Sequence, residues 1–206
     1  MGAITLIQDS GLRNTLTAEG VDVISFMPLA ANAGHFLASA APTAGSNKTT
    51  TLTSFAAANC PIRPVAAVAV ATEGTGNTWT GVSWTLVGYD QFGDWTVETI
   101  AGSNSGGTWT ATGAVCWRTL VSAAVTITGT ADATDRYTLG YGKTYGIGRR
   151  IRAAADVLFK AWNGATESGT VSTDYHSYAI AGTPDAAKLL TLTVRTLRPY
   201  VPGGAI

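Results

Sequence analysis

The two histidines of this chain are its residues best suited to acid–base chemistry at neutral pH. His35 lies in a segment rich in alanine. His176 stands two residues after Asp174 and two before Tyr178. On a strand these three side chains share one face, where Asp174 could orient His176 toward a nucleophile, as in a hydrolase. We favour a polar, solvent-facing strand surface, because no Gly-x-Ser-x-Gly nucleophile motif accompanies the pair.

Three carboxylates, Asp90, Asp94 and Glu98, cluster around a tryptophan-containing segment and raise the question of sugar hydrolysis. Asp94 and Glu98 would lie on one face of a strand about 13 Å apart. Even an inverting glycosidase holds its two carboxyl groups about 6.5–9.5 Å apart. We therefore expect no catalytic pair here and classify the chain as a non-enzyme.

Cofactor and metal motifs are incomplete. Gly142-Lys143-Thr144 resembles the end of a phosphate-binding loop, but the required opening glycine is replaced by Tyr137. Two cysteines and two histidines, all distant in sequence, do not make a four-ligand metal site. We expect no cofactor and no metal. Cys60 and Cys116 are interpreted as two packed thiols, with a disulfide as the alternative.

The overall composition indicates a weakly ionic surface. Only 13% of the 206 residues are charged, with 13 acidic and 13 basic side chains, while six Trp and 24 Gly are present. The zero net charge argues against nucleic-acid partners, whose binding depends on basic surfaces. No apolar run approaches about 18 residues, and the N-terminus lacks a secretory pattern, so we expect no membrane partner. Low charge also leaves association with other proteins unopposed.

Alternation of apolar residues with Ser and Thr predicts an all-β fold. Ten or more short strands separated by turn signals indicate an antiparallel β-sandwich or jelly roll. The expected strands lie within residues 3–8, 21–29, 63–71, 82–100, 108–112, 114–120, 124–128, 136–141, 156–162, 171–180 and 188–195. Residues 30–48, rich in Ala, Gly and Ser, show little periodicity and are expected to form an extended loop or arm on another surface. We therefore divide the chain into an N-terminal segment with an extended arm (1–48) and a sandwich body (49–206).

Residues 82–100 carry the clearest hairpin signal. Asp90-Gln91-Phe92-Gly93 separates two alternating runs, and we expect a four-residue loop that pairs residue 89 with residue 94. This register opposes Leu86 to Val97 and Trp84 to Thr99, so that both apolar rows share one buried face. A slip of one residue would turn one row to solvent.

A second hairpin is predicted where residues 156–162 are followed by Asn163-Gly164. Its register places Lys160 opposite Glu167. The alternative is a helix over residues 151–162, because Arg152 is followed by three alanines, which are strong helix formers.

The residues next to each tryptophan predict whether its side chain is buried or exposed. Trp84 and Trp95 alternate with threonine, so we expect both to be buried. Trp79, Trp109 and Trp162 lack as strong a pattern and are candidates for exposure. An exposed tryptophan would suit a non-catalytic sugar-binding surface.

Residues 63–151 resemble a family of phage structural proteins. The resemblance lies in Trp84–Gly93, Val97-Glu98-Thr99, Gly106-Gly107, Val115–Val121, Val125–Gly129 and Tyr141–Gly148. The order is a strand, a polar turn with glycine, a Glu-Thr strand, a glycine-rich turn and an aromatic strand. This order is similar to that of the capsid decoration, or cement, proteins of tailed bacteriophages.

The resemblance implies a homotrimeric virion protein on the outer capsid surface that bridges major capsid protein subunits and stabilises the head. Residues 149–152 (Arg-Arg-Ile-Arg) form a basic cluster. Candidate assembly contacts, chosen from the N-terminal segment, the arm and this basic cluster, are Ile4, Leu6, Phe26, His35, Phe36, Arg149, Arg150 and Arg152. The alternatives are a glycan-binding module of a tail spike or fibre, and another head–tail structural component.

Overall fold

The computed structural model describes residues 19–52, 55, 63–75 and 78–197, and these form an all-β fold. The elements are β1 (Glu19–Phe26), β2 (Asn32–Ala40), β3 (Gly45–Ser46), β4 (Thr49–Leu52), β5 (Val65–Thr72), β6 (Trp79–Asp90), β7 (Trp95–Ala101), β8 (Ser103–Ser105), β9 (Thr108–Ala131), β10 (Arg136–Gly146), the 3₁₀ turn η1 (Ala154–Asp156), β11 (Val157–Trp162), β12 (Ala165–Thr166), β13 (Thr170–Ser172), β14 (Ser177–Ala179) and β15 (Leu190–Leu197). The predicted strand at residues 3–8 lies outside the described residues.

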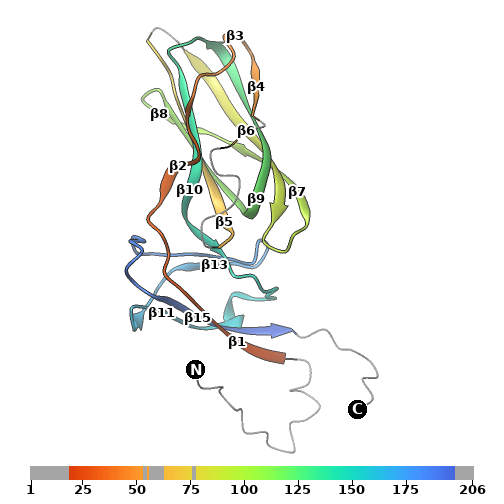
Figure 1. The fold of residues 1–206 in the computed structure, drawn as a ribbon, viewed down its shortest axis with the longest axis vertical. Helices are drawn as coiled ribbons and strands as arrows, with labels where there is room; N and C mark the ends of the chain where they lie inside the picture. Colours follow the sequence, from red (N-terminus) through yellow and green to blue (C-terminus); the bar gives the residue numbers. More distant parts are fainter. Residues whose placement is uncertain (1–18, 53–54, 56–62, 76–77, 198–206) are drawn as a thin grey trace, which may run out of the picture.

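The strands form a large antiparallel sheet that makes the β-sandwich, and a smaller four-stranded sheet below one end of it (Figure 1). The large sheet runs β13-β14-β10-β5-β9-β6-β7, with β2 on β10 and β3, β4 and β8 on β9. The small sheet has the order β1-β15-β11-β12. The sandwich predicted from alternation is thus confirmed.

A single long strand, β9, connects the two halves of the large sheet. Its first half pairs with β5 and its second half with β6, so that Trp117 is a register partner of both Val65 and Asp90. The separate strands expected within residues 108–128 are therefore one 24-residue strand. The ladder to β5 is interrupted near residues 113–115, where Glu98 Oε1 accepts the N–H groups of Ala114 and Val115 at 2.6 and 3.1 Å. The carboxylate replaces strand partners that the bulge removes.

The hairpin at 82–100 exists, but its predicted register is wrong by one residue. Tyr89 pairs with Trp95, and Asp90 and Asp94 close a three-residue loop with Gly93 at φ +89°. Asp90 Oδ1 accepts the N–H groups of Phe92 and Asp94, which fixes this tighter turn. A three-residue loop with glycine in the left-handed position is a common hairpin connection.

The slip changes which side chains are buried. Trp84 now faces Ile100 and Leu86 faces Glu98 on the core side of the sheet. Trp95 and Val97 point to solvent, with 56% and 58% of their surfaces exposed. The expectation that Trp95 is buried is therefore wrong, because residues one register step apart lie on opposite faces.

Residues 30–48 are not an arm or loop. Most of them form β2 and β3, which pair with β10 and β9 of the same chain. Two register shifts break the alternation of β2, which is why the sequence shows no clear period. β2 also approaches β10 very closely at Gly140, where an added Cβ would lie 1.8 Å from the Asn32 carbonyl oxygen. Only glycine fits this approach.

The second predicted hairpin is confirmed. β11 and β12 join through Asn163 and Gly164, both with positive φ, and the Glu167 N–H donates to the Lys160 carbonyl. The alternative helix is absent; the 3₁₀ turn η1 is the only helical element among the described residues. The strand expected at 171–180 is wrong in its middle, because a turn separates β13 from β14.

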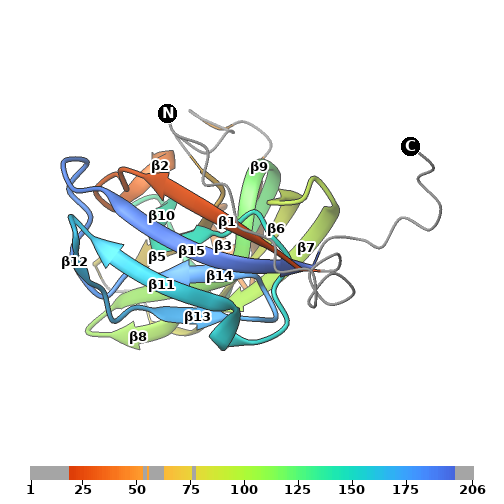
Figure 2. The same cartoon turned by 90° about the horizontal axis from the view of Figure 1, so that it is seen from below.

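The small sheet packs one face toward the sandwich and leaves the other open. Figure 2 looks onto this open face, with β11, β15 and β1 in front of the sandwich strands. Leu190, Leu192 and Val194 of β15 are buried in one continuous core with Trp84 and Trp117. Of the strands described before residue 48, β1 belongs to the small sheet, whereas β2 and β3 belong to the large sheet. The division of the chain at residue 48 stays a prediction.

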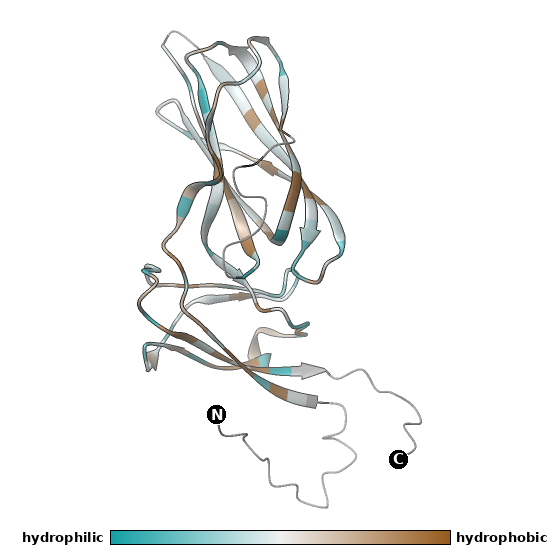
Figure 3. Cartoon of the chain, in the orientation of Figure 1, coloured by the Kyte–Doolittle hydropathy of each residue, from teal (hydrophilic) through white to brown (hydrophobic). Residues whose placement is uncertain are grey.

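Burial of the remaining tryptophans also differs from expectation. Trp79 and Trp109 are buried, and Trp162 is half-buried. The indole N–H of Trp79 donates to the Thr130 carbonyl, and that of Trp109 donates to Glu73. Figure 3 shows few strongly hydrophilic positions along the ribbon, in agreement with the low charge content.

Candidate functional site

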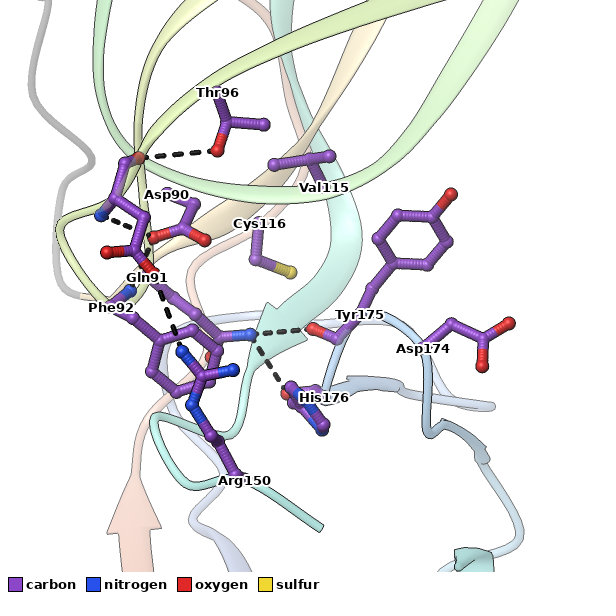
Figure 4. A pocket seen from close by; sticks show the side chains of 11 residues that line it. Asp90, Gln91, Phe92, Thr96, Val115, Cys116, Arg150, Asp174, Tyr175 and His176 are labelled. Atoms are coloured by element: carbon purple, nitrogen blue, oxygen red, sulfur yellow. Dashed lines mark hydrogen bonds and ion pairs between the residues drawn. The ribbon is translucent and has the colours of Figure 1, made fainter. Parts of the chain in front are cut away.

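A pocket with polar lining residues lies between the β6–β7 hairpin loop and the turn between β13 and β14 (Figure 4). Its volume is about 200 Å³. The lining residues come from the β6–β7 loop, β7, β9, the segment after β10 and the β13–β14 turn: Asp90, Gln91, Phe92, Asp94, Thr96, Val115, Cys116, Arg150, Asp174, Tyr175 and His176. The pocket thus collects residues that are far apart in sequence.

Gln91 joins the β6–β7 loop to two other segments of the pocket, the β13–β14 turn and the residues after β10. Its side-chain nitrogen donates to the carbonyls of Tyr175 and His176 at 2.6 and 3.1 Å. Its side-chain oxygen accepts the Gly148 N–H at 2.8 Å. Because all of these bonds go to backbone groups, Gln91 acts as a positioning residue for the pocket walls.

His176 lies in the β13–β14 turn with φ +48°, a left-handed conformation uncommon for histidine. Its Nδ1 accepts the Ile151 N–H at 3.2 Å, which assigns the ring proton to Nε2. Its ring packs edge-on against Phe92, with centroids 5.5 Å apart. Burial, and then the positive charge of Arg150, lower the pKa of His176, against an opposing effect of Asp174. The ring is therefore neutral at pH 7.

The hydrolase arrangement considered for Asp174 and His176 does not form. The two residues are in a turn rather than on one strand face, and no hydrogen bond joins their side chains. Figure 4 shows the Asp174 carboxylate directed away from the His176 ring. Asp174 accepts instead from the Thr173 hydroxyl at 3.5 Å.

The acidic residues of the loop support the fold. Asp90 caps its own turn, as described above. Asp94 pairs with Arg150 at 3.4 Å, and both side chains are about two-thirds exposed. The Arg150 guanidinium also lies over the Phe92 ring, 4.5 Å from its centroid. An exposed pair of this kind contributes at most about 1 kcal/mol.

The basic cluster divides between the two sheets. Arg149 pairs with Asp22 on β1 of the small sheet, whereas Arg150 reaches Asp94 beside the sandwich hairpin. Arg152 is exposed, and its backbone N–H donates to Asp156. The segment therefore links the sheets within one chain, and its assembly contacts stay a prediction.

Two of the predicted assembly residues are core residues. Phe36 is fully buried, and Phe26 is 9% exposed, with its ring 5.3 Å from that of Tyr145. Neither side chain is on the surface, so the expectation that they make surface contacts is wrong: both complete the core beneath β1 and β2. His35 is half-buried, with ring contacts to Phe36 and Tyr141. Ile4 and Leu6 lie outside the described residues.

Two exposed apolar surfaces were missed by the sequence analysis. We name the outer face of the small sheet, with Val21, Val23 and Phe159, the small-sheet face. We name the surface with Tyr89, Trp95, Val97 and Val121 the hairpin face. The valine alternation of residues 21 and 23 and the Asp90–Gly93 turn sequence, which also permits a three-residue loop, were the available sequence signals.

Other site types have little support in the described part of the chain. No group of three or more His, Cys, Asp or Glu residues is arranged to hold a metal ion there. Cys116 is buried, whereas Cys60 lies outside the described residues, so their pairing stays open. None of the described helical segments has the length and apolarity to cross a membrane. No family model, curated protein or solved structure matches the chain.

Proposed function

We propose that this chain is a non-enzymatic structural protein of a tailed-bacteriophage virion. In this role it decorates the outer capsid surface as a homotrimer and bridges neighbouring major capsid subunits. The resemblance of residues 63–151 to capsid decoration proteins supports the phage assignment. The physical basis is burial of weakly ionic surface rather than bond-making chemistry.

The observation that carries an assembly role is the small-sheet face. Val21, Val23 and Phe159 are 44%, 55% and 51% exposed on a four-stranded sheet whose opposite face is buried. The register places Val23 and Phe159 on either side of Thr193, so two exposed apolar side chains flank a threonine in one row across three strands. Exposed apolar side chains grouped on one face of a sheet favour a protein partner.

Charge on this surface also favours association. Of the outer-face residues from Val21 to Ser25 on β1 and from Thr191 to Arg195 on β15, Arg195 is the charged one, and the others are Val, Ser or Thr. Asp22 of β1 faces the other way and pairs with Arg149. Burial of this row in an interface would therefore desolvate few charges. The cost of desolvating charged groups, which opposes association, is then small.

The first prediction concerns binding to heads. The purified protein should have the mass of three chains by light scattering and should co-sediment with heads of its phage that lack it. Val23→Thr combined with Phe159→Thr should weaken co-sedimentation by about tenfold or more, because central apolar contacts dominate interface energies. Threonine preserves strand propensity, so the sheet should remain folded.

Val97→Thr is the matched control, since Val97 is equally exposed but lies on the hairpin face. It should leave head binding unchanged. A monomeric mass together with no co-sedimentation of the wild-type protein would contradict the proposal. If Val97→Thr weakened head binding as much as the double variant does, the small-sheet face would not be the specific contact with the capsid.

A further inference from the structure

The hairpin face carries an aromatic pair on an open sheet surface. Trp95 and Tyr89 are register partners on β7 and β6, with ring centroids 5.2 Å apart and planes at 77°. They are 56% and 43% exposed. The edge-to-face contact fixes both rings in place without covering them. The chain therefore holds a rigid aromatic surface in contact with water.

A cation and a hollow lie beside this pair. Tyr89, Gly93, Arg118 and Thr119 line a shallow hollow of about 300 Å³. One Arg118 guanidinium nitrogen lies 4.0 Å from the position that a Cβ on Gly93 would take, so the guanidinium reaches the hairpin loop. Within the described part of the chain Arg118 forms no hydrogen bond or ion pair. Its five N–H donors are therefore available to a ligand.

We propose that this surface binds a saccharide that carries a carboxylate, such as a uronic or sialic acid residue. The sugar ring stacks on the Trp95–Tyr89 pair, and its carboxylate pairs with Arg118. The electron-rich face of an indole attracts the polarised C–H groups of a sugar ring. The planar guanidinium matches a carboxylate through two parallel hydrogen bonds.

The arrangement favours a saccharide over a protein partner. The aromatic pair occupies one end of the face, the next row along β6 and β7 is Val87 and Val97, and the row beyond it carries the hydroxyls of Thr85 and Thr99, which are hydrogen-bonded to each other. Arg118, which has no ion pair with the described residues, lies next to the exposed aromatic pair and so favours a ligand that combines an anionic group with an apolar ring face. This site is independent of the small-sheet face and of the proposed assembly role.

The test is a fluorescence and calorimetric titration of the folded protein with a panel of uronic-acid and sialic-acid oligosaccharides. Methyl esters of the same sugars are the matched neutral ligands. Of the six tryptophans, Trp95 is the strongly exposed one, because the other five are buried or half-buried. A saturable change in emission should therefore report on Trp95, and esterification should weaken binding by about tenfold.

Three variants decide the outcome. Trp95→Ala and Arg118→Gln should each weaken binding by about tenfold or more, whereas Val23→Thr, at an equally exposed valine of the small-sheet face, should bind normally. Failure of every acidic sugar to bind, or equal binding of acids and esters, would overturn the proposal. So would loss of head co-sedimentation in Trp95→Ala with no change in sugar binding, because the face would then be a protein interface.

Discussion

Carboxylates in this protein mainly support irregular backbone. Each of six carboxylate side chains accepts two backbone N–H groups where a turn or bulge leaves them without strand partners; these residues are Asp90, Glu98, Asp135, Asp156, Glu167 and Asp185. Unpaired buried N–H groups are costly, so these bonds are structural. These carboxylates thus bind the protein's own backbone and stabilise its turns and bulges.

Glu167 illustrates this use of charge. Its register partner is Lys160, as predicted, but the side chains do not meet. Lys160 donates to the Gly169 carbonyl, whereas Glu167 accepts the N–H groups of Gly169 and Ala181. The buried Glu167 carboxylate therefore satisfies two backbone N–H groups instead of pairing with Lys160.

The second prediction concerns His176 and pH. Because burial and Arg150 lower its pKa in the folded state, the unfolded chain takes up a proton at higher pH than the folded chain does. The stabilisation is present above about pH 6.5 and is lost as the pH falls through the folded-state pKa. Urea unfolding between pH 7.5 and 5 should show this loss.

His176→Asn is the informative variant, because asparagine tolerates the left-handed backbone of this turn better than most residues. Its unfolding free energy should fall less between pH 7 and 5 than that of the wild type. If the unfolding free energies of the two proteins fell equally with pH, the pKa of His176 would be the same in the folded and the unfolded chain.

At the scale of elements, the close pairing of β2 with β10 depends on one missing side chain. The carbonyl of Asn32 and the backbone of Ala33 occupy the space that a Cβ on Gly140 would need. This contact turns an alanine-rich segment without clear periodicity into an ordered part of the sheet. Phe36 is buried as a result.

The third prediction is that Gly140→Ala lowers the free energy of unfolding by at least about 2 kcal/mol, because backbone must move to admit the methyl group. Gly182→Ala is the matched control: nothing lies within 4 Å of its added Cβ, and its φ is not in the left-handed region. The control should change stability by less than about 1 kcal/mol. Urea unfolding measures both, and equal effects would refute close packing of β2.

At the scale of the whole molecule, the two sheets meet at a small aromatic and cationic junction. Phe26 of β1 packs on Tyr145 of β10, and Arg63 lies over the Phe26 ring at 4.9 Å. The Tyr145 hydroxyl donates to the Leu29 carbonyl at 2.9 Å, and burial raises the pKa of Tyr145. Since the core is continuous across this junction, both sheets should unfold together.

The fourth prediction tests that coupling. The wild-type protein should show coincident unfolding by circular dichroism and by tryptophan fluorescence. Tyr145→Ala should lower stability by about 3–5 kcal/mol through a cavity, whereas Tyr145→Phe should cost about 1 kcal/mol for the lost hydrogen bond. Two separate transitions in the wild-type protein would show that the sheets fold independently.

Much of the fold can be predicted from local sequence. Alternation located β6, β10 and β15 to within a few residues, a run of apolar residues on both faces located β5, and Asn163-Gly164 predicted the turn between β11 and β12. These features depend on neighbouring residues alone, because side chains alternate across a strand and positive φ favours glycine or asparagine.

Register, by contrast, was decided by tertiary structure. Whether Asp90 pairs with Asp94 depends on backbone hydrogen bonds, and this one-residue choice exposes Trp95 instead of burying it. The candidate pocket likewise required Gln91 to join three distant segments. Sequence alone determined which side chains share a face within a strand. Only long-range packing determined which face is buried, because that depends on how each strand aligns with its neighbours.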